Sequence, residues 1–309
     1  MTGPELIAAL RSTIDLDMPL PGKGATPERH RQLMELGRRN LSLARLGEAH
    51  WDAVAILAEA GRNPIPGAIY GVWASEKPGQ ELHISATGDL SGTKTFCSGA
   101  GLIDRVLITA EKPKPLLLDI DLRQDPSRLN IDNSIWATTA FSETHTAKVA
   151  FNELPTSTAN RVGPPGWYLE RPGFWHGACG PAACWAGGAI GLVDFALTQT
   201  RDDPHTLAHL GAMRTLAWAL ESYLETAGRE IDAHPDDAAA ALIRALSVRH
   251  LVEQACTEIL RRFARAYGPH PLATNKVISQ RYQELDLYLR QSHAERDLEA
   301  LGTHLKRLG

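Results

Sequence analysis

The sequence lacks the features that mark several common classes of protein. It has no run of basic residues and a formal net charge of −4, so it offers no electrostatic footprint for nucleic acid. Its four cysteines show no C-x-x-C pairing, which argues against a zinc site or a disulfide framework and favours reduced thiols. It contains no glycine-rich dinucleotide fingerprint, phosphate loop or nucleophile elbow, and no spacing of ligand residues predicts a metal site.

Long, strongly apolar runs are also missing. Residues 1–5 lack the basic start and apolar core of a signal peptide. The most apolar stretch, Ala178 to Leu197, is rich in glycine and alanine and contains Pro181 and Asp194, so we predict a buried helix of small residues instead of a membrane span. The composition, 43% apolar and 22% charged, is that of an ordinary globular protein, and we expect a cytoplasmic one.

The first of three predicted segments, residues 1–66, is helical. Thr26 to Glu28 form a helix start signal, with a hydroxyl residue, a proline and an acid in succession. One helix is predicted from there toward Leu46, and a second from about Glu48 to Ala60. The turn residues at 63–67 then end helical structure.

The second segment, residues 67–160, consists of short runs between turn residues. Val149 and Phe151 alternate with more polar neighbours, as in a strand with one solvated face. Several short strands at this spacing predict a small barrel or sandwich. The runs are Ile69–Ser75, Glu81–Thr87, Arg105–Ala110, Leu116–Asp121, Ser134–Thr139 and Ala147–Phe151.

The third segment, residues 161–309, returns to helices. Apolar residues recur every three or four positions from Ala241 to Ile259 and again at Ile278, Tyr282, Leu285 and Leu289. Such stripes on successive helices predict an antiparallel four-helix bundle. The chain is therefore predicted to be α+β, with N-terminal helices, a small β-barrel or sandwich in the middle and a C-terminal antiparallel four-helix bundle.

One motif in the middle segment gives this order of elements a family resemblance. The stretch Thr93–Gly99 is similar to a strand motif of the acyl-CoA dehydrogenase superfamily, in which an aromatic residue and a hydroxyl residue two positions later flank a flavin ring. Those positions are Phe96 and Ser98 here. The resemblance covers roughly residues 45 to 300, with a shorter N-terminal helical domain than the family's full-length members have.

A second motif lies upstream of the first. The stretch Val72–Glu76 resembles the family's hydroxyl-Glu-Pro segment, which places Trp73 and Ser75 beside the flavin, although Lys77 here separates Glu76 from the proline. A flavin ring is a flat apolar plate with a polar rim, so it needs an aromatic side chain against its face and hydroxyl or backbone groups at its edge. Taken singly, such residues are ordinary strand and turn residues. Their order, followed by a helical bundle, favours the flavin interpretation.

The resemblance implies FAD, bound non-covalently between the β segment and the bundle. Arg201 resembles an arginine that reaches the FAD pyrophosphate, where a planar guanidinium suits two phosphate oxygens. Asp202 and Asp203 depart from the family's pattern and would oppose a phosphate, so a solvated loop charge is the alternative for Arg201.

Two residues compete for the catalytic position. The family's dehydrogenases use a carboxylate to remove an α-proton while a hydride passes to the flavin, and Glu295 is the nearest chemical analogue. His293 lies where the family's monooxygenases carry a histidine, and a continuation of the apolar stripe beyond Leu289 puts His293 on the buried helix face, with Glu295 turned away. A core histidine and an exposed helical charge are the respective alternatives.

From the resemblance we expect an oxidoreductase that desaturates an acyl thioester such as acyl-CoA, assembles as a homodimer or homotetramer, and could pass electrons to a partner protein. Two alternatives stay open. A flavin-dependent monooxygenase of the same fold is favoured by His293 and by the absence of the family's Gly-Ser-Asp segment, which touches CoA. A non-catalytic relative with a structural role is favoured by the short N-terminal domain and by the acids after Arg201.

Overall fold

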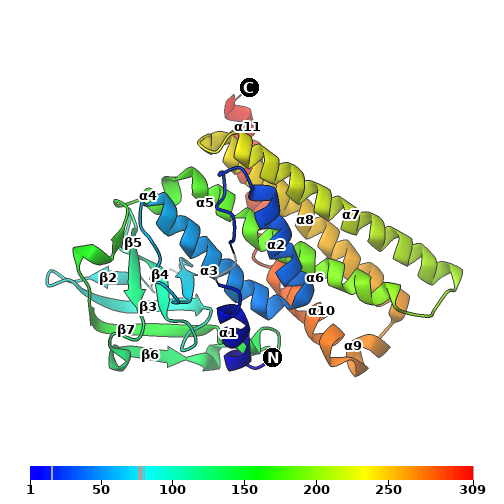
Figure 1. Ribbon diagram of the computed structural model, residues 1–309, viewed down its shortest axis with the longest axis horizontal. Helices are drawn as coiled ribbons and strands as arrows, with labels where there is room; N and C mark the ends of the chain where they lie inside the picture. Colours follow the sequence, from blue (N-terminus) through cyan, green and yellow to red (C-terminus); the bar gives the residue numbers. More distant parts are fainter. Residues whose placement is uncertain (15–16, 76–78, 80, 309) are drawn as a thin grey trace. The chain divides into compact units, whose positions relative to one another are not determined.

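The computed structural model describes residues 1–14, 17–75, 79 and 81–308 (Figure 1). Helices, then strands, then helices follow one another along the chain, which confirms the predicted α+β class. The chain forms two compact units, each built from two stretches of sequence. The first unit comprises Met1–Asp17 and Leu46–Phe174, and the second comprises Met18–Arg45 and Trp175–Gly309. The division into domains at residues 66 and 160 stays a prediction.

The first unit contains two four-stranded sheets. All neighbouring strands are antiparallel except β1 and β4. One sheet has the order β1 (Tyr70–Trp73), β4 (Arg105–Ala110), β5 (Leu116–Asp121) and β8 (Arg161–Val162). The other has the order β2 (Leu82–Ile84), β3 (Asp89–Cys97), β7 (Ala147–Pro155) and β6 (Leu129–Asp132).

One of the predicted strands is absent from these sheets. The stretch Ser134–Thr139 does not pair, and the strand in this region is β6, just before it. The side chain of Asp132 accepts a hydrogen bond from the backbone N–H of Ser134 and starts a short 3₁₀ helix, η2 (Asn133–Ile135). A local side-chain bond to the backbone therefore competes with strand pairing here. The other 3₁₀ helices are η1 (Pro126–Arg128), η3 (Ser142–Thr144) and η4 (Thr158–Asn160).

The helices of the first unit cover its sheet residues and fix a buried carboxylate. Residues Ala53, Ile56 and Leu57 of α3 (Leu41–Glu59) pack with Tyr70 in one apolar core. Helix α1 (Gly3–Arg11) ends in Arg11, whose guanidinium donates to both oxygens of the buried Asp104 at 3.0 and 2.9 Å. Asp104 also accepts from the backbone N–H of Ile69 at 2.8 Å, so its charge is fully paired. Helix α4 (Trp167–Glu170) belongs to this unit, and α5 (Pro172–Gly177) runs from the first unit into the second.

The second unit is a helical bundle. Helices α6 (Cys179–Leu197), α7 (Pro204–Ala233) and α8 (Ala238–Tyr267) lie side by side in Figure 1, and the short turns between them make neighbours antiparallel. Helix α10 (Lys276–Leu289) packs against α6 and α8, after the short α9 (His270–Thr274). Helix α11 (Glu295–Leu308) contacts α8.

An N-terminal helix completes this bundle. Helix α2 (Thr26–Arg39) makes an extensive contact with α6, although sequence order assigns α2 to the predicted N-terminal domain. The predicted helix from Thr26 to Leu46 is wrong in its length because Asn40 is extended. The Asn40 side chain accepts a hydrogen bond from the backbone N–H of Leu43 and starts α3 instead.

Glycines allow α2 and α6 to approach each other closely. A Cβ atom on Gly37 of α2 would lie 2.2 Å from the carbonyl oxygen of Cys184. One on Gly187 of α6 would lie 1.9 Å from the carbonyl oxygen of Met34. No side chain fits in either place, so backbone packs against backbone.

The small-residue helix predicted from the sequence is confirmed as α6. By length and composition the helical run Pro172–Leu197 could cross a membrane, but 78% of its most apolar window is buried inside the protein. That burial is the behaviour of a core helix, in keeping with its glycines and alanines.

We predict that Gly187→Ala lowers the free energy of unfolding by about 3 kcal/mol, because its new methyl group must push two helix backbones apart. Urea denaturation followed by circular dichroism would measure the loss. Gly211→Ala in α7 is the matched control, because a Cβ there meets nothing within 4 Å. That change should raise stability by about 0.5–1 kcal/mol, as alanine does in an exposed helix. Equal effects of the two substitutions would contradict the close packing.

Candidate functional site

The first candidate region is the turn at the end of β3, in the first unit. Lys94 pairs with Val149 and Cys97 with Ala147, so two residues of β3 face a single residue of β7 in a β-bulge. The second of these two is Phe96, with a backbone φ of 58°. The backbone N–H of Ser98 donates to the carbonyl oxygen of Phe96 at 3.0 Å, which closes a three-residue turn.

This turn holds Phe96 in a costly conformation and exposes its ring. Phe96 is 57% exposed, whereas Cys97 beside it is fully buried. Burial raises the pKa of the Cys97 thiol to about 12, so this cysteine is not a nucleophile. A bulky residue in the left-handed region costs of the order of 1–3 kcal/mol, and such strain clusters at functional sites. A core strand residue would have a buried side chain and an extended backbone, and Phe96 has neither.

The other residues predicted to bind the cofactor in this unit have different environments. Trp73 is 3% exposed, and its indole N–H donates to the carbonyl oxygen of Ser98 at 3.0 Å, so it supports the turn from behind. Ser75 is exposed and follows β1. Glu76 and its neighbours 77, 78 and 80, on which part of the resemblance rests, lie outside the described residues. The structure thus brings Trp73, Phe96 and Ser98 together, and the cofactor roles of all four residues stay predictions.

Sequence reasoning missed the segment that supports this turn. The Ser98 hydroxyl lies 3.0 Å from that of Thr146, which lies 3.0 Å from that of Thr144. The backbone N–H of Gly99 donates to the carbonyl oxygen of Thr144 at 2.8 Å, which ties the two turns together. The residue between the two threonines, His145, is also left-handed, with φ 45°. The sequence held no local signal for this support, because the contact joins Ser98 and Thr146, which are 48 positions apart in the chain.

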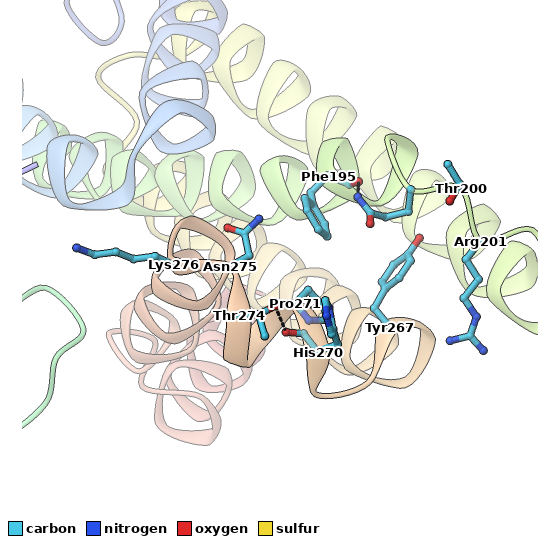
Figure 2. A pocket seen from close by; sticks show the side chains of 10 residues that line it. Phe195, Thr200, Arg201, Tyr267, His270, Pro271, Thr274, Asn275 and Lys276 are labelled. Atoms are coloured by element: carbon cyan, nitrogen blue, oxygen red, sulfur yellow. Dashed lines mark hydrogen bonds between the residues drawn. The ribbon is translucent and has the colours of Figure 1, made fainter.

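The second candidate region is a pocket in the second unit, with a volume of about 620 Å³. It lies between the α6–α7 turn and the chain from the end of α8 to the start of α10 (Figure 2). Figure 2 shows the aromatic rings of Phe195 and Tyr267 between two cations, Arg201 and Lys276, which lie at opposite ends of the view. The remaining lining residues are Gln199, Thr200, His270, Pro271, Thr274 and Asn275.

Arg201 is partly engaged within its own loop. Its Nε donates to Asp203 at 2.6 Å, and its Nη1 donates to the carbonyl oxygen of Ala266 at 3.1 Å. Asp203 in turn accepts from the hydroxyl and backbone N–H of Thr206, which holds its pKa below the ordinary value and starts α7. Within the described chain, Nη2 of Arg201 has no partner. Asp203 thus pairs with Arg201.

The structure differs from the sequence prediction at the proposed catalytic position. Helix α10 has the predicted stripe, with Ile278, Leu285 and Leu289 buried, but it ends at Leu289. His293 lies in the turn that follows, where its side chain is 56% exposed. The prediction that His293 shares the buried face is therefore wrong, because the chain leaves the helix four residues too early.

Local hydrogen bonds explain this early end. The backbone N–H groups of Gln291 and Ser292 bond three residues back, and Ala294 is left-handed, with φ 47°. The His293 ring lies 3.3 Å from a carboxylate oxygen of Asp297. Glu295 is the first residue of α11 and is exposed. The catalytic roles of His293 and Glu295 stay predictions.

Two buried histidines are poor candidates for acid–base chemistry. Burial lowers the pKa of His30 to about 4, and its Nδ1 bonds to the carbonyl oxygen of Leu224. Burial likewise lowers the pKa of His50 to about 4, and its Nδ1 accepts from the backbone N–H of Tyr70. Both rings are neutral near pH 7 and are satisfied by backbone groups. Across the described residues, no cluster of three His, Cys, Asp or Glu side chains could hold a metal ion.

Comparison with solved structures identifies the fold. No protein-family model matches the sequence, and no curated protein matches it significantly. The structure is similar to that of TdsC, a dibenzothiophene monooxygenase from Paenibacillus sp. A11-2, in complex with FMN and indole. The identity is 15% and the TM-score 0.79, and the match covers 99% of this chain and 96% of TdsC.

Two further structures of known enzymes share this fold. The methanesulfinate monooxygenase MsuC from Pseudomonas fluorescens is 16% identical, with a TM-score of 0.71, over 99% of this chain and 96% of MsuC. Butyryl-CoA dehydrogenase from Megasphaera elsdenii is 12% identical, with a TM-score of 0.73, over 90% of this chain and 81% of that enzyme. The chain therefore has the acyl-CoA dehydrogenase fold, as its β3 motif predicts.

Proposed function

We propose that the protein is a flavin-dependent oxidoreductase. The observation that carries this proposal is the exposed phenyl ring of Phe96, held in a left-handed turn beside the half-buried Ser98. An accessible aromatic face with a hydroxyl near its edge meets the requirements of a flavin ring. The likeness in fold to TdsC, whose structure contains FMN, supports the same conclusion.

The residues of this turn fit a flavin in distinct roles. Phe96 would pack against the ring face, and Ser98 and the exposed Ser75 would bond to its polar rim. Trp73 would act from behind, since its N–H already holds the Ser98 carbonyl oxygen. A bound flavin supplies two-electron redox chemistry, while these side chains bind the ring, orient it and keep water from one face.

We predict that Phe96→Gly weakens flavin binding at least roughly tenfold while raising the stability of the flavin-free protein by about 1 kcal/mol. Glycine adopts φ 58° without strain, whereas loss of a core phenylalanine would cost about 3–5 kcal/mol. Fluorescence titration with FMN and FAD and thermal unfolding of the flavin-free protein would measure the two effects.

The matched control for this substitution is Glu153→Gly. Glu153 also has a positive φ, 52°, and its side chain is 77% exposed on β7. Its replacement should give a similar gain in stability and leave flavin affinity unchanged. A wild-type protein that is colourless and takes up neither FMN nor FAD would contradict the proposed function and favour the non-catalytic alternative.

We further propose that the cofactor is FAD and that Arg201 contacts its pyrophosphate. The Nη2 atom of Arg201, which has no partner among the residues that the structure describes, is the group that would bind a phosphate oxygen. The adjoining pocket of about 620 Å³ has a size typical of small-molecule sites, and Tyr267 and Phe195 offer aromatic surface there for an adenine ring. FMN, the flavin in the TdsC structure, has no adenine and is the competing cofactor.

We predict that Arg201→Gln weakens FAD binding by roughly tenfold to a hundredfold, as expected for loss of a charged hydrogen bond, and weakens FMN binding less. Isothermal titration calorimetry with each flavin would measure both. Arg290→Gln is the control, because Arg290 is an exposed arginine of the same unit that pairs with Asp286 at 3.3 Å. Equal affinities of the wild type for FMN and FAD would reject FAD as the preferred form.

For the reaction, we propose oxygenation as the first candidate and desaturation as the second. A glutamate that removes an α-proton near neutral pH needs desolvation to raise its pKa, and Glu295 is exposed. TdsC and MsuC, both monooxygenases, support the oxygen-dependent reading. Desaturation of an acyl thioester is the second candidate, supported by the likeness to butyryl-CoA dehydrogenase.

We predict that a panel of acyl-CoAs mixed with the oxidised flavoprotein under argon leaves its visible absorbance unchanged, because Glu295, the candidate base, is exposed to solvent. The reduced flavoprotein, mixed with isotopically labelled oxygen and indole as a probe, should yield oxygenated product detectable by mass spectrometry. Anaerobic bleaching by any acyl-CoA would instead establish desaturation, and Glu295→Gln would then be expected to abolish it.

A further inference from the structure

Helix α7 has one side that faces solvent and carries no charged residue for about four turns. The buried residues of the helix lie on its other side, where it packs against α2, α6 and α8. Residues that recur every three or four positions follow one side of a helix. The solvent-facing row, which spans about 23 Å at 1.5 Å per residue, is the outer face of α7. It consists of the exposed Leu207, Ala208, Gly211, Thr215 and Trp218 and the half-buried Ser222.

Apolar groups dominate this outer face. Trp218 is 63% exposed and Leu207 is 49% exposed. The hydroxyl groups of Thr215 and Ser222 donate to the carbonyl oxygens of Gly211 and Trp218, each at 3.0 Å, so their protons are satisfied within the helix. An exposed tryptophan within an uncharged row indicates a surface that binds another molecule, because tryptophan is enriched among the residues that contribute most to protein interfaces.

Two charges of opposite sign flank the outer face along one edge. Arg214 lies four residues before Trp218 and Glu221 lies three residues after it, so helical geometry puts both on the same side of the tryptophan. These two side chains approach each other only to 4.0 Å, and they remain 54% and 43% exposed. Each therefore has exposed surface for a group of opposite charge on another molecule.

This distribution of charge is complementary to itself. A second copy of α7, lying antiparallel across the outer face with Trp218 of each chain at a two-fold axis, has its two charges in reverse order. Arg214 then faces Glu221 of the partner subunit, and the same pair recurs on the other side of the axis. A parallel copy would instead place like charges opposite each other. The charges therefore favour an antiparallel contact between two copies.

We propose that two copies of this protein associate through the outer face of α7, in an antiparallel, two-fold symmetric contact centred on Trp218. A stable interface buries roughly 800 Å² of each partner. One tryptophan supplies about 150–250 Å² of that area, so the contact must continue along the helix. The outer face provides this length without burying a charge, and Arg214 and Glu221 lie at its edge, where an ion pair stays partly solvated.

The first test is the mass of the 309-residue protein in solution, measured by sedimentation velocity over a range of concentrations. The wild type should be a dimer or a larger even-numbered assembly. Trp218→Glu puts a charge at the centre of the contact and should weaken association at least roughly tenfold. The mass should then fall by half at concentrations where the wild type stays associated.

The matched control for this substitution is Val277→Glu. Val277 lies on α10 of the same unit and is 65% exposed, close to the 63% of Trp218. Its replacement adds the same charge at an equally exposed apolar position and should leave the mass unchanged. Circular dichroism of both variants would show that each keeps its helices.

The second test reverses the two flanking charges one at a time. Arg214→Glu creates two like-charge pairs across the antiparallel contact, and Glu221→Arg does the same. Each should weaken self-association roughly tenfold at low ionic strength. An equimolar mixture of the two variants should recover wild-type association, because each mixed dimer again contains two pairs of opposite charge. A parallel contact would leave the single variants as strongly associated as the wild type.

A wild-type protein that is monomeric at every concentration would overturn the inference, and so would an assembly whose mass Trp218→Glu leaves unchanged. Single charge reversals without effect, or a loss of association that the mixture does not repair, would overturn the antiparallel contact. None of these measurements depends on flavin. Their failure would therefore leave the proposed function standing, and a failure to bind flavin would leave this inference standing.

Discussion

The bundle depends on the backbone contact between α2 and α6. At Gly37 and Gly187 each helix presents bare backbone to the other, and no side chain larger than hydrogen fits. The contact brings an N-terminal helix into a unit whose other helices come from the second half of the chain. Because α6 is buried almost all round, the neighbouring helices take their positions from it, and so does the pocket beside Phe195.

In the first unit, two turns place residues other than glycine in the left-handed backbone conformation. Phe96 and His145 have left-handed backbone conformations, which glycine would adopt at a lower cost in free energy. Backbone hydrogen bonds join the two turns that contain them. The bulge in β3 turns the ring of Phe96 outward while Cys97 remains in the core. Strain at Phe96 is thus offset by ordinary pairing on either side, as expected where a side chain is displayed for binding.

The sequence predicted elements whose stability is local and failed where distant groups compete. Of the predicted stripe Ile278, Tyr282, Leu285 and Leu289, Tyr282 is half-buried and the other three are buried. A helical period of apolar residues can be read directly from the sequence. The spacing of apolar residues does not show where a helix ends. The sequence therefore predicted His293 on the buried face of α10, which ends at Leu289. Asn40 was missed for a related reason, because its side chain starts a helix within an otherwise helical pattern.

The features of the candidate site, too, could be predicted from the sequence only in part. The succession of helical, β and helical segments, the helical stripes and the placing of an aromatic residue two positions before a hydroxyl could all be predicted from the sequence, because each depends on neighbours in the chain. The tertiary structure was needed to show that Phe96 is exposed, that Arg201 donates to the carbonyl oxygen of Ala266, and that the Ser98 hydroxyl lies beside that of Thr146. Each of these properties depends on residues far apart in sequence, which come together only when the chain has folded.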